Sequence, residues 1–214
     1  MRSDLLLTCI GGPLLAVFLL RGRARRLLSA MLGGMLAAFL GGSVSGALRG
    51  LAQCDALFAV LYISPAVEEG LKLALFLLFL FACRLPDRAL PEIAVAIGAG
   101  FAMMESVALQ FTASDAAVLA LFARTFCSAL IHVACALMLV VAVRLVRRLA
   151  LETVSGLLGL YAATVTVHAL YNLLVSGGLA ARVLGYLFPA AVIVVWRCRL
   201  SAGHMKEGTD CADV

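Results

Sequence analysis

The sequence predicts an all-α protein, a polytopic bundle of about seven transmembrane helices. Hydrophobic residues make up 64% of the 214 residues and charged residues only 14%, and the mean hydropathy is +1.09. Soluble domains carry roughly twice this share of charged residues. A soluble fold of this length needs more polar surface than such a chain provides. The composition therefore excludes the soluble, disordered and disulfide-scaffold classes.

Apolar residues are grouped into seven runs, and this grouping gives the expected number of helices. A helix needs about 20 mostly apolar residues to cross a bilayer, and the breaks between the runs carry charged or turn-forming residues. The runs cover residues 4–21, 27–48, 57–83, 91–111, 117–143, 153–176 and 179–196. We expect one transmembrane domain over residues 1–200 and a short cytoplasmic tail over residues 201–214.

Lys and Arg residues are distributed unevenly among these breaks. One set of alternate breaks contains twelve of the 17 Lys and Arg residues. Lys72 belongs to neither set, because it lies inside an apolar run. The opposite set contains only Arg2, Arg49, Arg124 and Arg182. Because cytoplasmic loops carry the excess of basic residues, we expect the N-terminus outside and the C-terminus in the cytoplasm of a multi-pass plasma-membrane protein. The first run is expected to be a retained helix, since basic residues follow it, whereas they precede a cleaved signal. The dispersed charge predicts no nucleic-acid partner.

Several runs contain charged or polar residues where apolar residues are expected. A charged group at the bilayer centre costs about 2.5–3.5 kcal/mol on insertion scales. These residues are Glu68, Glu69 and Lys72 in the third run, Glu105 in the fourth, His132 in the fifth, and His168 and Asn172 in the sixth. With a rise of about 1.5 Å per residue, all of them reach one layer, somewhat toward the outer leaflet. We therefore expect one site, in a catalytic core over about residues 57–176.

This set contains the groups needed to hydrolyse an amide. A carboxylate in a pocket of low dielectric can act as general base on a water molecule. Glu68 and Glu69 are adjacent and point about 100° apart on a helix, so one can activate water while the other pairs with Lys72. Imidazole and amide groups can donate hydrogen bonds to the oxyanion that develops at the attacked carbonyl. The expected donors are His132, His168 and Asn172.

A metal ion is the alternative to this chemistry. Glu105, His132 and His168 form a two-His, one-Glu set that can bind zinc and leave a position open for water. The chain has no H-E-x-x-H motif, which favours metal-free or metal-optional chemistry over a zinc enzyme.

Other residues are expected to have structural roles. Pro65 is expected to begin the regular helix of the third run after a broken segment over residues 55–64, so that the helix dipole favours the negative charges in its first turns. Arg124 and Ser128 share a helix face with His132, and Arg124 can extend to the outer interface. Glycines that permit close helix packing are Gly42 and Gly46 on one helix, and Gly98 and Gly100 on another.

The order of the polar motifs resembles that of a known family. Glu68 to Lys72 reads E-E-x-x-K, Phe101 to Glu105 reads F-x-x-x-E, His132 is isolated on its helix, and His168 to Asn172 reads H-x-x-x-N. In this order, on four successive helices, the motifs resemble the PrsW family of intramembrane proteases. They resemble more distantly the CAAX prenyl endopeptidase superfamily, whose motifs are E-E-x-x-x-R, F-x-x-x-H and H-x-x-x-N/D. This chain departs from the CAAX motifs at two positions: the basic residue Lys72 comes one position earlier than the Arg, and Glu105 stands where the superfamily has His. These departures argue against a prenyl-protein substrate.

The resemblance implies an intramembrane endopeptidase whose partner is a membrane-anchored protein in the bilayer. PrsW proteases are associated with site-1 cleavage of an anti-sigma factor. The resemblance leaves the metal open and gives no oligomeric state. It implies catalytic roles for Glu68, Glu69, His132 and His168, and supporting roles for Glu105, Asn172 and the motif residues Lys72 and Phe101.

Two other classes of function are weighed against the peptidase. A transporter or proton relay also uses intramembrane carboxylates and imidazoles, but it predicts an inverted repeat with broken helices in both halves, and Pro65 is the only such break found in the sequence. A non-catalytic scaffold subunit of a membrane protease would lack the glutamate pair that Glu68 and Glu69 provide. The peptidase is preferred over both.

Overall fold

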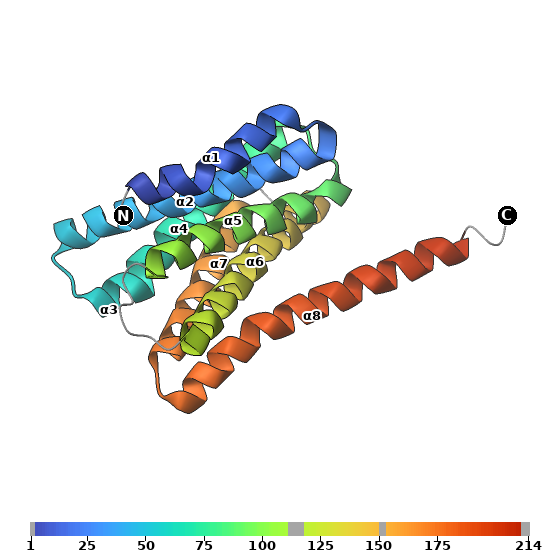
Figure 1. Cartoon of the computed structure of the whole chain (residues 1–214). Coiled ribbons are helices and arrows are strands. Elements are labelled where there is room, and N and C mark those ends of the chain that lie inside the picture. The colour runs from blue at the N-terminus through green and yellow to red at the C-terminus, as the bar shows by residue number, and fades with distance from the viewer. Residues whose placement is uncertain (1–2, 111–117, 150–152, 211–214) are drawn as a thin grey trace.

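The computed structural model describes residues 3–110, 118–149 and 153–210. These residues form helices and no strand (Figure 1), which confirms the all-α prediction. The long helices are α1 (Ser3–Leu19), α2 (Gly22–Ala52), α4 (Ser64–Ala82), α5 (Leu90–Gln110), α6 (Val118–Leu149), α7 (Thr153–Ser176) and α8 (Leu179–Asp210). The short elements are α3 (Ala56–Phe58), the π-helical segment η1 (Ala59–Ile63) and the 3-10 helix η2 (Asp87–Ala89).

Five helices of the described ranges have the length and hydropathy of membrane spans. These spans are Gly22–Ala52, Asp87–Gln110, Phe122–Leu145, Val154–Ser176 and Leu179–Cys198. Helix α1 has 17 residues, at the short limit of a membrane span. Helix α4 has 19 residues and carries two glutamates and a lysine. Five of the seven predicted spans are thus confirmed by length and composition, and the count of seven stays a prediction.

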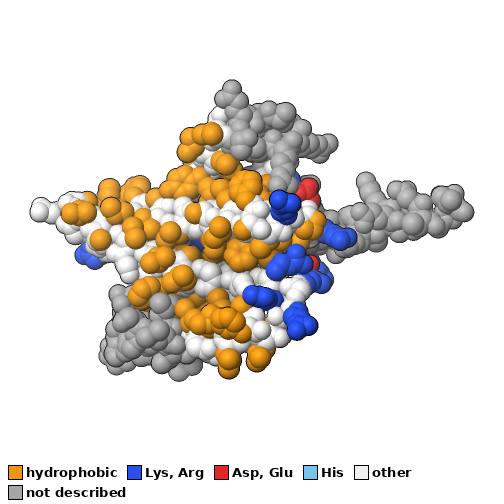
Figure 2. All heavy atoms as spheres, turned by 90° about the horizontal axis from the view of Figure 1, so that it is seen from above, with side chains coloured by type: hydrophobic (Ala, Val, Ile, Leu, Met, Phe, Trp, Pro, Cys, Tyr) orange, Lys and Arg blue, Asp and Glu red, His pale blue; other side chains and the backbone are white. Residues whose placement is uncertain are grey.

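Basic side chains gather mainly at one end of the bundle. Figure 2 shows most of the visible Lys and Arg side chains there. At this end Arg23 Nη2 lies 2.7 Å from Glu92 Oε1, which joins α2 to α5. Arg144 Nη2 also donates a hydrogen bond to the Asp87 carbonyl at 2.7 Å, which joins α6 to η2. The gathering agrees with the alternation of basic breaks in the sequence, while the assignment of this end to the cytoplasm stays a prediction.

Helix α4 is preceded by a π-helical segment, so its start differs from the sequence prediction. Asp55 caps the first turn, since its Oδ1 accepts a hydrogen bond from the Phe58 N–H at 2.7 Å. The backbone is then helical through η1 into α4, and the Ser64 N–H donates to the carbonyl of Ala59, five residues earlier. Regular α-helix begins at Ser64, next to Pro65 as expected. The segment before Pro65 is thus irregular as expected, but it is helical, so that the predicted helix dipole at the turns of Glu68 and Glu69 is not that of an isolated helix start.

Glycines hold α5 between α2 and α6 at very short backbone separation. A Cβ atom added at Gly100 would lie 2.0 Å from the Met31 carbonyl oxygen of α2, and one added at Gly98 would lie 2.8 Å from the His132 carbonyl oxygen of α6. Only glycine fits at these positions. By contrast, a Cβ at Gly46 would meet nothing within 4 Å, so the expected packing at that position is not formed within the chain. Helix α5 is therefore fixed against both neighbours.

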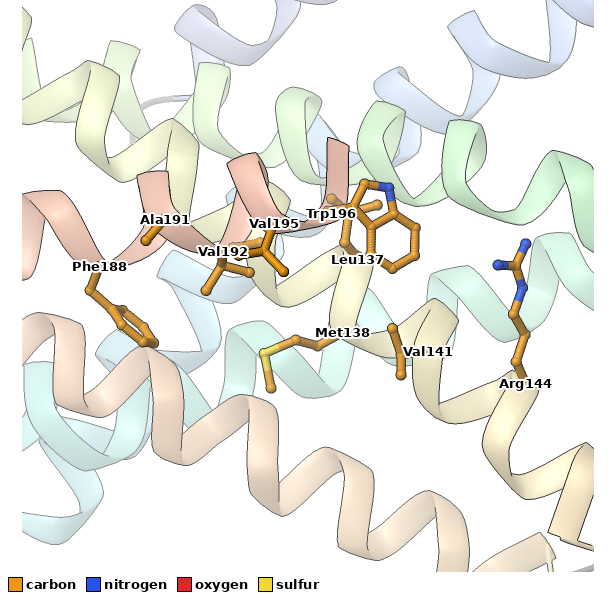
Figure 3. Close-up of a pocket in the computed structure, with 10 residues that line it drawn as sticks. Leu137, Met138, Val141, Arg144, Phe188, Ala191, Val192, Val195 and Trp196 are labelled. Carbon is orange, nitrogen blue, oxygen red and sulfur yellow. The ribbon is translucent and has the colours of Figure 1, made fainter. Parts of the chain in front are cut away.

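Helix α8 is the most exposed of the five spans, with 11% of its window Leu179–Cys198 buried. It contacts chiefly α6 and α7 and diverges from the bundle toward the C-terminus (Figure 1). Apolar side chains of α6 and α8 face a groove of about 620 Å³, with Arg144 and Trp196 toward one end (Figure 3). Helix α8 continues to Asp210, so no helix end marks the predicted boundary at residue 200. Residues 211–214 and the predicted break at 112–115 lie outside the described ranges.

Candidate active site

Five polar side chains from four helices, all buried except the partly exposed Glu105, form one contiguous group, here called the polar cluster. Its members are Glu69 and Lys72 of α4, Glu105 of α5, His132 of α6 and His168 of α7. Lys72 Nζ lies 2.5 Å from Glu69 Oε1 and 3.0 Å from His132 Nδ1. The other His132 nitrogen, Nε2, lies 2.6 Å from Glu105 Oε2. His168 Nδ1 lies 2.7 Å from Glu69 Oε1.

The chemistry of the donors fixes the direction of these hydrogen bonds. An ammonium group only donates, so Lys72 donates to Glu69 and to His132 Nδ1. His132 Nε2 then carries the proton and donates to Glu105. His168 donates from Nδ1 to Glu69, which leaves its Nε2 as the acceptor when the ring is neutral. The cluster therefore sets the tautomers of both histidines.

The sequence left open which glutamate pairs with Lys72, and the structure pairs Lys72 with Glu69. Both side chains of this pair are fully buried. Glu68 points to a different side of α4, where its side chain is 14% exposed and its Oε2 lies 3.8 Å from His168 Nε2. Oε2 of Glu68 has no hydrogen-bond partner among the described residues. The two adjacent glutamates thus occupy different environments.

Glu68 and His168 line a cavity of about 550 Å³. The cavity reaches toward the end of the bundle opposite the basic one, where α7 ends and α8 begins. Glu105, Ser128 and Asn172 also line it, and α8 contributes Arg182 and Tyr186. Polar and apolar side chains both contribute to its wall. This cavity is large enough for several side chains of a bound peptide.

Asn172 is held beside the cavity by the irregular backbone before α4. Its Nδ2 donates to the Val60 carbonyl at 3.0 Å. In a regular helix this carbonyl would accept from the N–H of residue 64, but the Ser64 N–H donates to Ala59. The next residue is Pro65, which has no N–H. The π-helical segment therefore frees the carbonyl that Asn172 binds.

Ser128 and Phe101 complete the surroundings of the polar cluster. Ser128 Oγ donates to Glu105 Oε2 at 2.6 Å, and this hydrogen bond between α6 and α5 agrees with the structural role expected for Ser128. Ser128 lies four residues before His132 in the sequence, and this spacing on one helix face is the signal that places Ser128 near the site. The Phe101 ring is buried, with its centroid 4.7 Å from that of His132 and 4.8 Å from Lys72 Nζ. Phe101 thus covers the cluster with an apolar ring.

A family model described as the PrsW family of intramembrane metalloproteases matches residues 14–197 of the chain. The chain belongs to the PrsW family. No curated protein and no solved structure matches it. The match extends beyond the polar motifs at both ends, and it supports an intramembrane peptidase over the transporter and scaffold alternatives. Its substrate class is accordingly a membrane protein in a lipid bilayer.

The PrsW description names a metal, and the side chains present can hold one. The ligand atoms of Glu68, His132 and His168 all lie within 4.8 Å of one another. Two imidazoles and a carboxylate are a donor set that zinc accepts, and Glu68 Oε2 is unpartnered. This set differs from the predicted one, since Glu68 stands in place of Glu105, which instead contacts His132 and Ser128. His132 has both ring nitrogens in hydrogen bonds and would exchange one of them for the metal.

Proposed function

We propose that this PrsW-family chain cleaves a peptide bond of a membrane-anchored protein, with Glu68 as the general base. One observation carries the assignment: the Glu68 side chain lines the cavity, and its Oε2 lies 3.8 Å from His168 Nε2 with no hydrogen-bond partner among the described residues. Glu69 Oε2 also lacks a partner, but the Glu69 side chain has no exposed surface and its Oε1 accepts from both Lys72 and His168. Glu69 is therefore assigned to positioning.

In the proposed reaction, Glu68 takes a proton from a water molecule, and the water oxygen attacks the carbonyl carbon of the substrate. The negative charge that develops on the carbonyl oxygen is stabilised by the free N–H of the Asn172 amide and by His168 when its ring is protonated. The proton then passes to the departing amide nitrogen. Glu69 supports both states of His168, because it accepts from Nδ1 throughout.

His132 receives a different role from the one its motif suggested. Its ring is 1% exposed, and its two nitrogens are bound to Lys72 and Glu105. It therefore has no free N–H for an oxyanion. We assign His132 to holding Lys72 and Glu105 in place. If zinc is bound, Glu68, His132 and His168 would hold it and it would supply an activated water.

The finer assignments follow from the charge distribution and the family. With the basic end in the cytoplasm, the N-terminus lies outside, α1 and α4 complete seven crossings, and the cavity opens toward the outer leaflet of the plasma membrane. A membrane-anchored anti-sigma factor, cut at site 1 on its outer side, is the proposed substrate.

Cleavage of single-span proteins in cells tests this function. The chain is co-expressed with tagged single-span candidates that include membrane-anchored anti-sigma factors, and a shortened product is scored by immunoblot. Glu68→Gln should abolish the product at unchanged enzyme level, whereas Glu92→Gln, which alters an exposed glutamate, should retain it. Full cleavage by Glu68→Gln would remove Glu68 as base. Metal analysis of purified wild type and His168→Ala tells whether a zinc ion accompanies the protein.

A further inference from the structure

Two arginines that have no role in the proposed reaction line the cavity. Arg124 lies on α6 and Arg182 on α8, and both line the same cavity as Glu68 and His168. Basic residues are rare toward this end of the bundle, to which the sequence assigns only four of them. Two of those four thus lie at one cavity. This concentration of positive charge calls for a ligand of opposite charge.

The guanidinium group of Arg182 is held by backbone carbonyls at the C-terminal end of α7. Its Nε donates to the Val175 carbonyl at 3.3 Å and its Nη2 to the Gly177 carbonyl at 3.4 Å. The C-terminal carbonyls of a helix carry partial negative charge and favour a cation. A guanidinium has five N–H donors, so three remain for another partner.

Arg124 makes no hydrogen bond or ion pair with any residue in the described ranges. The two acidic residues of the cavity wall do not neutralise it. Glu105 already accepts from His132 and Ser128, and the nearest charged group to Glu68 among the ion pairs is His168. Among the described residues, the cavity wall therefore combines Glu68 with two guanidinium groups that form no ion pair.

We propose that Arg124 and Arg182 bind an acidic side chain of the substrate, so that the enzyme selects segments with Asp or Glu near the cleaved bond. This inference rests on the proposed function, and it names the substrate class. Guanidinium groups match carboxylates through paired, charge-assisted hydrogen bonds.

Binding of short peptides tests the proposal separately from catalysis. The full-length Glu68→Gln variant, in detergent micelles, is titrated against a fluorescent ten-residue Ala/Ser peptide with one central Glu and against its Gln twin. Anisotropy should give about tenfold tighter binding of the Glu peptide. Adding Arg124→Gln or Arg182→Gln should remove this preference. Adding Arg49→Gln, an exposed arginine of the same end that does not line the cavity, should leave it unchanged.

Three results would overturn the proposal: equal affinity for the Glu and Gln peptides, a preference that survives in the Arg124→Gln/Arg182→Gln double variant, or variants that lose only binding to phosphatidylglycerol nanodiscs. The last result would make the arginines a lipid phosphate site. A charge swap gives a second readout, because Arg124→Glu should favour a peptide with Lys over the one with Glu. If the arginine variants alter selectivity while Glu68→Gln still cleaves in cells, the proposed base fails and this inference stands.

Discussion

The Nδ1 atom of His168 lies 2.7 Å from Glu69 Oε1, and this contact turns the opposite ring nitrogen toward Glu68, 3.8 Å away. One glutamate thus orients the imidazole from behind, while its sequence neighbour faces the same ring from the cavity. Carboxylates that orient histidines in this way fix their tautomer and raise their basicity. This geometry is the basis for proposing Glu69 as the positioning group and Glu68 as the reacting group.

Removing one partner of the buried Glu69–Lys72 pair should destabilise the protein strongly. Glu69→Gln leaves a fully buried ammonium without its carboxylate, and we expect a loss of about 3–5 kcal/mol. The double variant Glu69→Gln/Lys72→Met should lose less than the sum of the two single variants, because no unpaired charge remains. Unfolding free energies in mixed micelles measure this cycle. Additive losses would show that the two side chains do not interact.

Glu105→Ala should lower activity by about 10–100-fold through loss of positioning. The variant leaves His132 Nε2 and the Ser128 hydroxyl without their acceptor. Glu92→Ala provides a matched control, since it removes a glutamate that is partly exposed and paired only with Arg23 at the bundle end. Cleavage rates of a substrate identified in cells compare the two. Near-wild-type cleavage by Glu105→Ala would remove Glu105 from the site.

Gly100→Ala should separate α5 from α2. The added methyl group would lie 2.0 Å from the Met31 carbonyl oxygen, and overpacking of this kind typically costs about 1–3 kcal/mol. Gly46 lies at an exposed position of α2. A methyl group added by Gly46→Ala meets nothing within 4 Å, so this variant should be neutral or slightly stabilising. Thermal unfolding in detergent measures both. Equal melting temperatures for the two variants would contradict the close approach.

Asn172 and Pro65 should be energetically coupled through the Val60 carbonyl. Asn172→Ala leaves this exposed carbonyl without its side-chain donor and should cost about 0.5–1.5 kcal/mol. Pro65→Ala restores a backbone N–H five residues after Val60, where a π-helical bond can form. In the Pro65→Ala background, Asn172→Ala should therefore cost clearly less. An unchanged cost in the double-mutant cycle would show that the carbonyl gains no backbone donor.

The helices and the convergence of the polar side chains could be predicted, because both depend on spacing along the chain. A run of apolar residues gives a helix, and residues at equal depth in neighbouring helices can meet. Glu69, Lys72, Glu105, His132 and His168 illustrate this, since their motifs lie on successive helices and their side chains touch in the structure. Their catalytic roles stay proposals.

The partners within the site could not be predicted, because they depend on how each helix is rotated. The sequence placed Glu68 and Lys72 four residues apart on one face, yet Lys72 binds Glu69 three residues away. The π-helical segment before α4 has no sequence signal beyond Pro65, and it changes which carbonyl is free for Asn172. Likewise, the metal-compatible set contains Glu68 because the rotation of α4 brings it, and not Glu105, to that position.

The polar cluster and α8 are attached to the molecule in different ways. Every member of the cluster belongs to α4, α5, α6 or α7, and α5 is fixed by backbone contact with α2 and α6. Arg182 and Tyr186 belong to α8, which is largely exposed and contacts chiefly α6 and α7. A tilt of α8 would therefore change the space available to a peptide beside Arg182 and Tyr186, whereas no member of the polar cluster lies on the helix that moves.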